Sequence, residues 1–225
     1  EPEEQLSLLG DSTLVDSAAA VLELTEELTR QLQEIDSFEL YHDLEIPLAG
    51  ILARMEATGI AVDVDTLEEQ LATFVGQVAE EEAAARELAG DDTLNLSSPK
   101  QLQTVLFETF GMPKTKKTKT GWSTAAKEIE QLAVKHPHPF LDHLLAHREY
   151  QKMKTTLEGL IKTVQPDGRI HTTFNQTVAS TGRLSSTEPN LQNIPVRTPA
   201  GRKIRSAFVV GAGYETLLTA DYSQI

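Results

Sequence analysis

Residues 139–174 read PFLDHLLAHREYQKMKTTLEGLIKTVQPDGRIHTTF, and the fold class is decided within this stretch. A helix is predicted for residues 139–164. Its apolar side chains recur at helical spacing and form a stripe of Met153, Leu157, Leu160 and Val164. After the turn-like residues 165–168, β-branched and aromatic residues dominate from Ile170 to Phe174. The sequence therefore predicts an α+β fold, mostly helical, with part of an antiparallel sheet near the C-terminal end.

Two amphipathic helices are expected near the N-terminus. The first follows the cap-like residues 11–13, and its apolar stripe contains Leu14, Ala18, Val21, Leu28, Leu32 and Ile35. The second has a stripe of Leu44, Leu48, Ile51 and Met55. It contains Pro47, which must lie in a first turn or mark a kink because proline lacks an N–H, and it stops at Gly59. We expect both stripes to pack into a core.

Further helices are expected in the middle of the chain. Asp65 and Glu68 have capping-box spacing at the start of a long acidic helix that ends at Gly90, with Leu67, Leu71, Phe74 and Val78 as its buried stripe. Ser98-Pro99 opens a short helix that Gly111 closes. The lysine-rich residues 114–121 form an exposed loop, and Ser123 or Thr124 is expected to cap the next helix.

Two hairpins are expected in the last part of the chain. Residues 170–174 can pair with the polar residues 177–186. A second hairpin is expected between residues 208–210 and 216–220, around the glycines of residues 211–213. Its last strand would deliver Asp221 at its end.

Composition is that of a folded protein that does not enter a membrane. The chain has 225 residues, 40% apolar and 24% charged, enough for one or two domains. It has no cysteine, which excludes disulfides and thiolate metal sites. The N-terminal residues do not resemble a signal peptide, and no apolar stretch approaches a membrane span, so we expect a cytoplasmic protein.

Charge is divided unequally along the chain. Residues 1–99 carry 3 basic and 24 acidic side chains, whereas residues 100–225 carry 17 basic and 10 acidic ones. A polyanion would therefore have to bind the second half. A solvated acidic helix beside a mildly basic domain explains the same asymmetry.

Asp221 follows an apolar stretch and precedes the polar residues Tyr222, Ser223 and Gln224. A carboxylate in such a place suits Mg²⁺, which prefers oxygen ligands and is usually held by one or two carboxylates together with substrate phosphates. A lone aspartate at a strand end also serves as a turn former or cap. The local pattern leaves both interpretations open.

Four blocks in one order carry a resemblance to a known family. They are residues 95–102 (NLSSPKQL), 180–186 (STGRLSS), 190–197 (NLQNIPVR) and 221–225 (DYSQI). Together they closely resemble the bacterial DNA polymerase I family, that is, family A, and the likeness covers nearly everything after residue 38. The resemblance implies a DNA-directed DNA polymerase, a nucleotidyltransferase of DNA replication and repair.

The resemblance also implies the catalytic chemistry. Asp221 would be a ligand of two Mg²⁺ ions, and the main-chain carbonyl of Tyr222 would help to hold one of them. In such a two-metal site the ions activate the primer 3′-hydroxyl and stabilise the departing pyrophosphate of a deoxynucleoside triphosphate. The second metal-binding aspartate and the fingers helix of the family are absent from these 225 residues, so we expect this piece alone to be inactive.

Other residues match family positions that contact primer-template DNA. Near the primer terminus these are Arg183, Asn190, Gln192 and Asn193. Arg183 would test base-pair shape in the minor groove, where the acceptors are common to all pairs. Along the DNA backbone they are Arg148, Lys152, Lys154, Asn95, Ser97, Ser98, Lys119, Ser123 and Thr124. For the loop lysines, a merely solvated surface remains an equal alternative.

The family order predicts four segments. Residues 1–37 resemble the tail of an exonuclease-like domain, 38–94 a helical connector, 95–165 the thumb, and 166–225 the N-terminal part of a truncated palm. The chain begins without methionine and ends inside a motif, so it is expected to be a fragment of a monomeric parent enzyme.

Two functions from other classes are weighed against the polymerase. The fragment could be a non-catalytic duplex-DNA-binding module in which Asp221 is idle, and it would then bind DNA without any role for Mg²⁺. It could also be an acidic interaction module that binds a protein through residues 1–99. The histidines at 143 and 147 have i, i+4 spacing but lack the glutamate of a zinc motif at Leu144, so we predict a structural role for them.

Overall fold

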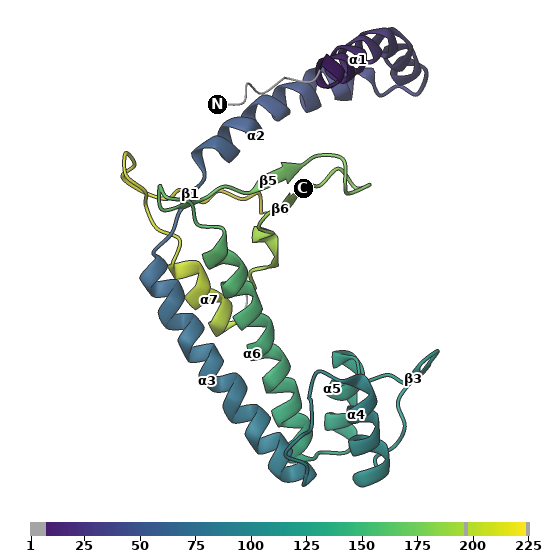
Figure 1. The fold of residues 1–225 in the computed structure, drawn as a ribbon, viewed down its shortest axis with the longest axis vertical. Coiled ribbons are helices and arrows are strands. Elements are labelled where there is room, and N and C mark those ends of the chain that lie inside the picture. Colours follow the sequence, from purple (N-terminus) through teal and green to yellow (C-terminus); the bar gives the residue numbers. More distant parts are fainter. Residues whose placement is uncertain (1–7, 196–197, 224–225) are drawn as a thin grey trace. The chain divides into compact units, whose positions relative to one another are not determined.

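The computed structural model describes residues 8–195 and 198–223, with side chains from residue 14 onward (Figure 1). It is mostly helical with short antiparallel strand pairs, which confirms the predicted α+β class. The chain forms two compact units, residues 1–57 with 176–184 and residues 58–175 with 185–225. Among the described helices, none is both long enough and apolar enough to cross a membrane.

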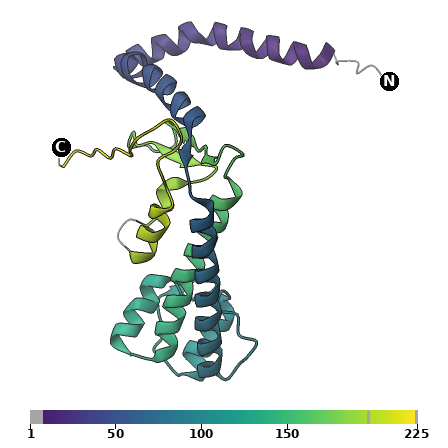
Figure 2. The ribbon, with the colours of Figure 1, turned by 90° about the vertical axis from the view of Figure 1, so that its left-hand side faces the viewer.

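The first unit contains α1 (Leu8–Glu34), the π-helical segment η1 (Leu40–Glu45) and most of α2 (Ile46–Thr58). Helix α1 already includes residues 11–13, so the predicted cap there is wrong. Pro47 lies in the first turn of α2, directly after η1, as predicted. Figure 2 shows α1 and α2 as separate rods, in purple and blue.

The apolar stripes of α1 and α2 are exposed, contrary to prediction. Leu14 and Val21 on α1 are 72% and 66% exposed, and Ile35, directly after the end of α1, is 68% exposed. Ile51 and Met55 on α2 are also exposed. Helical periodicity identifies an apolar face but not the surface that covers it. In the described part of this chain no segment covers these faces, and only Leu52 of α2 is buried.

In the second unit, α3 (Val64–Ala89) and α6 (Pro139–Lys162) lie side by side along most of their length (Figure 1). Their predicted stripes are buried apart from Leu71 and Val164, which are half-buried. The cap of α3 is Asp63 rather than Asp65, because the Asp63 side chain accepts a 3.1 Å hydrogen bond from the Thr66 N–H. Gly90 ends α3 with φ 65°, as predicted.

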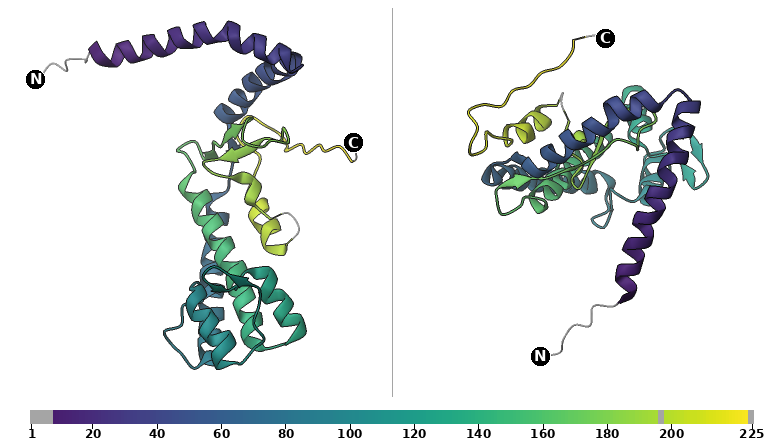
Figure 3. Two further views of the ribbon diagram at one scale, coloured as in Figure 1. Left: turned by 90° about the vertical axis from the view of Figure 1, so that its right-hand side faces the viewer. Right: turned by 90° about the horizontal axis from the view of Figure 1, so that it is seen from above.

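The core of this unit has two clusters, one at each end of the α3–α6 pair. One joins α4 (Pro99–Thr104), the π-helical η2 (Val105–Thr109) and α5 (Ala126–Lys135) to the start of α6, through Leu102, Leu106, Ile129, Phe140 and Leu144. The other joins α3 and the end of α6 to α7 (Pro199–Ser206), through Leu67, Phe74, Met153, Leu157 and Ile204. Figure 3 shows α7 beside α6.

Two helix starts were predicted around the lysine-rich segment. Ser98 caps α4 as predicted, with its Oγ accepting from the Gln101 N–H at 3.4 Å. The cap of α5 is Ala125, whose side chain makes no hydrogen bond, so Ser123 and Thr124 do not cap it. Between them the lysines form a short hairpin of β2 (Lys117–Thr118) and β3 (Gly121–Trp122).

The remaining strands join distant parts of the chain. β1 (Ile60–Ala61) pairs antiparallel with β4 (Arg169–Ile170). β5 (Thr173–Asn175) pairs with β6 (Ser185–Thr187), so the first predicted hairpin forms only between the ends of the two predicted segments. Ile170 pairs with Ile60 instead.

The second predicted hairpin is wrong. Residues 216–220 form no strand, and Phe208 bridges Val62 instead. The Val209 N–H donates to the Ala61 carbonyl, and the Asp63 N–H donates to the Ala207 carbonyl. The backbone groups that the hairpin would have used are therefore bonded to the segment that continues β1, which leaves residues 215–223 as an exposed coil.

Candidate nucleic-acid interface

A groove of about 530 Å³ lies beside α6 and contains several of the predicted DNA contacts. Its predicted members are Ser97, Arg148, Lys152 and Asn193; Leu96, His147, Gln151, Thr155 and Thr156 complete the lining. They come from the turn before α4, from α6 and from the 3₁₀ helix η3 (Leu191–Asn193). The fold therefore gathers residues from two of the four family-like blocks, 95–102 and 190–197, and from α6 into one groove.

The α6 side of the groove is one helix face. Residues 148, 151, 152 and 155 follow the i, i+3, i+4, i+7 spacing of a single stripe. Sequence reasoning named Arg148 and Lys152 but missed Gln151 and Thr155, which the same periodicity would have found. Two cations alternate there with an amide and a hydroxyl. The Thr155 hydroxyl donates to the Gln151 carbonyl at 3.0 Å, which leaves the cations and the Gln151 amide as the donors that can contact phosphates.

Arg148 is partly fixed inside the protein. Its Nη1 donates a 2.6 Å hydrogen bond to the Thr124 carbonyl, and burial lowers the pKa of the guanidinium from its ordinary value. It stays protonated because arginine is not deprotonated in proteins. Burial also lowers the pKa of the neighbouring His147, so this imidazole is neutral at pH 7.

The two lysines of α6 that were predicted to contact DNA face different sides. Lys152 is exposed at the groove, whereas the Nζ of half-buried Lys154 lies 4.0 Å from the carboxylate of Glu158. Residues two apart point about 200° apart around a helix with 3.6 residues per turn. Lys154 is therefore not brought to the same surface.

The turn before α4 uses most of its polar groups internally. The Asn95 side chain accepts from the Ser97 N–H at 2.8 Å, and the Asn95 N–H donates to the Gln101 side chain at 2.7 Å. Ser98 is the cap of α4. Ser97 alone of the three predicted residues lines the groove.

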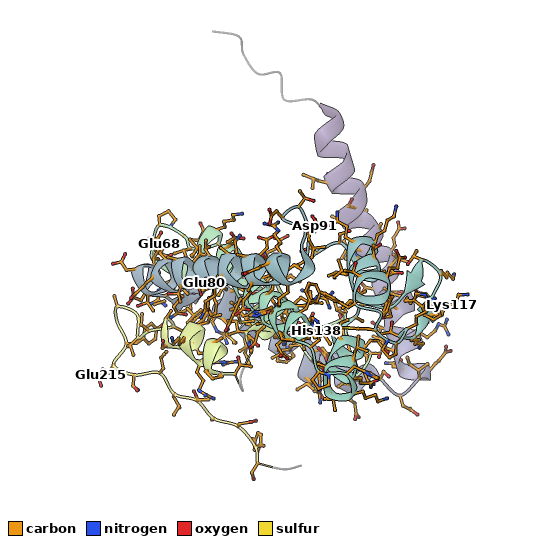
Figure 4. The ribbon with its side chains drawn as sticks, turned by 90° about the horizontal axis from the view of Figure 1, so that it is seen from below. Glu68, Glu80, Asp91, Lys117, His138 and Glu215 are labelled. Atoms are coloured by element: carbon orange, nitrogen blue, oxygen red, sulfur yellow. The ribbon has the colours of Figure 1, made fainter. Side chains whose placement is uncertain are left out.

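The hairpin of β2 and β3 presents cations at its surface. Lys119 is exposed, and Figure 4 shows Lys117 pointing outward from the hairpin. The ammonium groups of Lys114 and Lys117 lie 5.3 Å and 6.0 Å from the centroid of the Trp122 ring. Ser123 accepts from the Ala125 N–H, and Thr124 is buried, so neither hydroxyl is directed at the groove lining.

The predicted contacts near the primer terminus are divided between the two units. Arg183 is exposed in the loop of residues 176–184, which belongs to the first unit. In the second unit, the Asn190 side chain accepts from the Gln192 N–H at 3.0 Å and so caps η3. Asn193 lines the groove, and Gln192 is exposed. Val196 and Arg197, at the end of the same block, lie outside the described residues.

Asp221 and Tyr222 lie in the exposed coil of residues 215–223, where Figure 4 labels Glu215. Gln224 and Ile225 lie outside the described residues. No group of three or more metal-binding side chains occurs in the described ranges. Asp221 thus offers one accessible carboxylate, which fits a Mg²⁺ ion whose remaining ligands are water and substrate phosphates.

Most of the chain matches a family model. Residues 64–225 match the model described as DNA polymerase family A. DNA polymerase I of Mycobacterium tuberculosis is 54% identical over 231 residues, which cover 99% of this chain and 25% of that protein. DNA polymerase I of Bacillus subtilis is 48% identical over 210 residues, covering 92% and 24%.

A solved structure is similar as well. It is described as the POL domain of Pol1 from M. smegmatis in complex with DNA primer-template and dNTP. Its TM-score is 0.89 at 57% sequence identity, over 92% of this chain and 36% of that one. The chain spans about a quarter of the length of the curated relatives that it matches. With a family model matched over most of its length and relatives of this identity, the chain belongs to DNA polymerase family A.

Proposed function

We propose that the parent protein is a DNA-directed DNA polymerase that adds deoxynucleotides to a primer 3′-hydroxyl. The present chain would supply the grip on the primer-template and one metal-binding carboxylate. The observation that carries the proposal is the groove beside α6, where a stripe of cations and small donors faces Ser97 and Asn193 in a chain of this family. The DNA and dNTP bound by the M. smegmatis relative support the same substrates.

The groove suits a ligand that is recognised by its backbone rather than by its sequence. Arg148 and Lys152 supply charge, and the Gln151 amide supplies a neutral donor on the same stripe, whereas the Thr155 hydroxyl donates to the Gln151 carbonyl at 3.0 Å. Phosphate contacts of this kind position a duplex but carry no sequence information. The many acidic side chains of α3 repel a polyanion, so the charge asymmetry of the chain favours binding at α6.

Asp221 is the proposed metal ligand, with the Tyr222 carbonyl as an additional donor. Bound Mg²⁺ would activate the primer hydroxyl and neutralise charge on the leaving pyrophosphate. The role of this chain is to hold the carboxylate where the primer end lies. Arg183, Asn190, Gln192 and Asn193 would hold the terminal base pair.

The proposed division of the chain follows the family order. Residues 1–37 would end an exonuclease-like domain, 38–94 would connect it to the thumb of residues 95–165, and 166–225 would begin the palm. The exposed apolar faces of α1 and α2 are consistent with segments that belong to a larger protein.

The test is primer extension by the parent-length protein carrying Asp221→Ala, with primer-template affinity measured in parallel. Loss of extension with unchanged affinity supports the proposal. Undiminished extension would refute the role of Asp221. If the wild-type parent binds duplex DNA in a salt-dependent way but never extends a primer with Mg²⁺ and dNTPs, the chain is instead a non-catalytic DNA-binding module.

A further inference from the structure

One arginine outside the groove holds the segment that leads to Asp221. Arg169 belongs to β4, directly opposite Ala61 of β1. Its Nη1 donates to the carbonyls of Thr58 and Gly59, each at 3.4 Å, and its Nη2 donates to the carbonyl of Ala212 at 3.4 Å. Its guanidinium carbon also lies 5.6 Å from the centroid of the Tyr214 ring. A single side chain thus connects the start of β1 to residues 212–214.

The segment that Arg169 holds is a tight turn. The Tyr214 N–H donates to the Gly211 carbonyl at 3.2 Å, and Gly213 has φ 87°, the left-handed conformation that a type II turn requires at its third residue. The turn follows Val209, whose N–H is bonded to the carbonyl of Ala61 in β1. Residues 215–223 follow as a coil that leads to Asp221.

Gly211 allows the guanidinium to approach this turn. A Cβ at Gly211 would lie 2.2 Å from the Arg169 Nη2 and 3.0 Å from the Ala61 Cβ, distances that require the arginine to move. A small pocket of about 200 Å³ at the same place is lined by Arg169 and Tyr214 and also by Thr216 and Leu217 of the coil. The lining of this pocket therefore includes the first residues of the coil that leads to Asp221.

We propose that Arg169 is a positioning residue for Asp221. This inference rests on the proposed function, because it matters only if Asp221 holds the metal. The coil of residues 215–223 leaves directly from this turn, so the position of the turn fixes where the coil begins. A displacement of about 1 Å at a reacting group can lower a rate by about 10²-fold. Arg169 fixes the turn and through it the carboxylate, without touching substrate.

The experiment uses the parent-length enzyme with Arg169→Ala and Arg169→Lys. We measure the single-turnover rate of nucleotide addition at saturating dNTP, the Kd for primer-template, and amide hydrogen exchange across residues 209–223. Arg169→Ala is expected to lower the rate by about tenfold or more, to change the Kd by less than about twofold, and to speed exchange at the turn. Arg169→Lys keeps a cation beside Tyr214 and is expected to recover part of the rate.

A matched control is Arg205→Ala. The Arg205 guanidinium also donates to a main-chain carbonyl, that of Ile194 at 3.4 Å, but it does not contact the turn. The Arg205→Ala variant should be less stable than wild type. Its amide hydrogen exchange at residues 211–214 and its rate of nucleotide addition should stay close to those of wild type. An unchanged rate in Arg169→Ala, or an equal loss of rate in Arg205→Ala, overturns the positioning role.

Failure of this inference is distinguishable from failure of the proposed function. If Asp221→Ala abolishes extension while Arg169→Ala extends at the wild-type rate, only the positioning role is wrong. If Asp221→Ala extends normally, the proposed metal ligand is wrong, and the positioning role is overturned with it.

Discussion

The Nη1 of Arg148 donates a 2.6 Å hydrogen bond to the main-chain carbonyl of Thr124, so an arginine on the groove side of α6 also holds the segment that enters α5. Arg148→Ala should therefore lower both DNA affinity and stability. A hydrogen bond from a charged donor contributes about 1.5–3 kcal/mol to the free energy of unfolding. Thermal or denaturant unfolding measures the second effect. Unchanged stability would mean that the bond to Thr124 contributes nothing in solution.

Lys152→Ala separates binding from folding, because Lys152 is exposed at the same groove. The slope of log K against log salt concentration for duplex DNA should become shallower by about 0.9, the value for one phosphate contact. The melting temperature should not change. Lys162→Ala is the matched control, since Lys162 is exposed at the end of the same helix and does not line the groove. If the slope of log K against log salt concentration is the same in wild type and Lys152→Ala, Lys152 does not contact a DNA phosphate.

The cap of α3 should make stability depend on acid pH. Hydrogen bonds from the hydroxyl and the N–H of Thr66 lower the pKa of the Asp63 carboxyl. A lowered pKa in the folded state contributes stability that is present above the unfolded pKa, about 3.9, and is lost as pH falls through the folded pKa. Asp63→Asn keeps a capping side chain without the charge, so its stability should fall less steeply below pH 4 than that of wild type.

Melting temperatures measured between pH 6 and pH 2.5 test this expectation. Asp65→Asn is the control, because Asp65 lies in the same first turn of α3 but is not its cap. If the melting temperatures of wild type and Asp63→Asn fall in parallel with pH, protonation of the Asp63 carboxylate does not cause the loss of stability in acid.

Alanine substitutions at Gly59 and Gly90 can separate the cost of a left-handed backbone conformation from the cost of steric crowding around an added Cβ. Both have left-handed conformations, with φ 62° and 65°. A Cβ at Gly90 meets nothing within 4 Å, whereas at Gly59 it would lie 2.8 Å from the ring of His171 and 2.9 Å from the Ile170 carbonyl. Gly90→Ala should cost about 1–2 kcal/mol of unfolding free energy. Gly59→Ala should cost clearly more, and equal values in denaturant unfolding would show that the His171 side relaxes freely.

The long helices could be predicted from sequence because their signals are local. The apolar stripe on α6 repeats every three or four residues, and a single residue, Gly90, marks the end of α3. The structure confirms both. The exposed stripes of α1 and α2 show the limit of this reasoning. Amphipathic spacing specifies a face that avoids water, but what covers that face is a property of other segments.

The strands were harder to predict, because pairing partners are remote in sequence. Residues 208–210 have good β propensity, but their partner is Val62 rather than the nearby residues 216–220. For the candidate site, resemblance identified the residue types along α6. The bond between Arg148 and Thr124 and the contacts of Arg169 depend on tertiary structure, so no spacing rule could reveal them.

The pairing of residues 60–63 with both β4 and residues 207–209 has a consequence for how the chain is made. Residues 60–63 leave the ribosome before either of their partners. At about 5–20 residues per second, residues 207–209 follow them on the order of ten seconds later. During that interval the paired helices α3 and α6 can form, but the edge of β1 that receives Val209 must wait with unpaired backbone groups. The order of synthesis therefore makes the segment leading to Asp221 the last part of this unit to assemble.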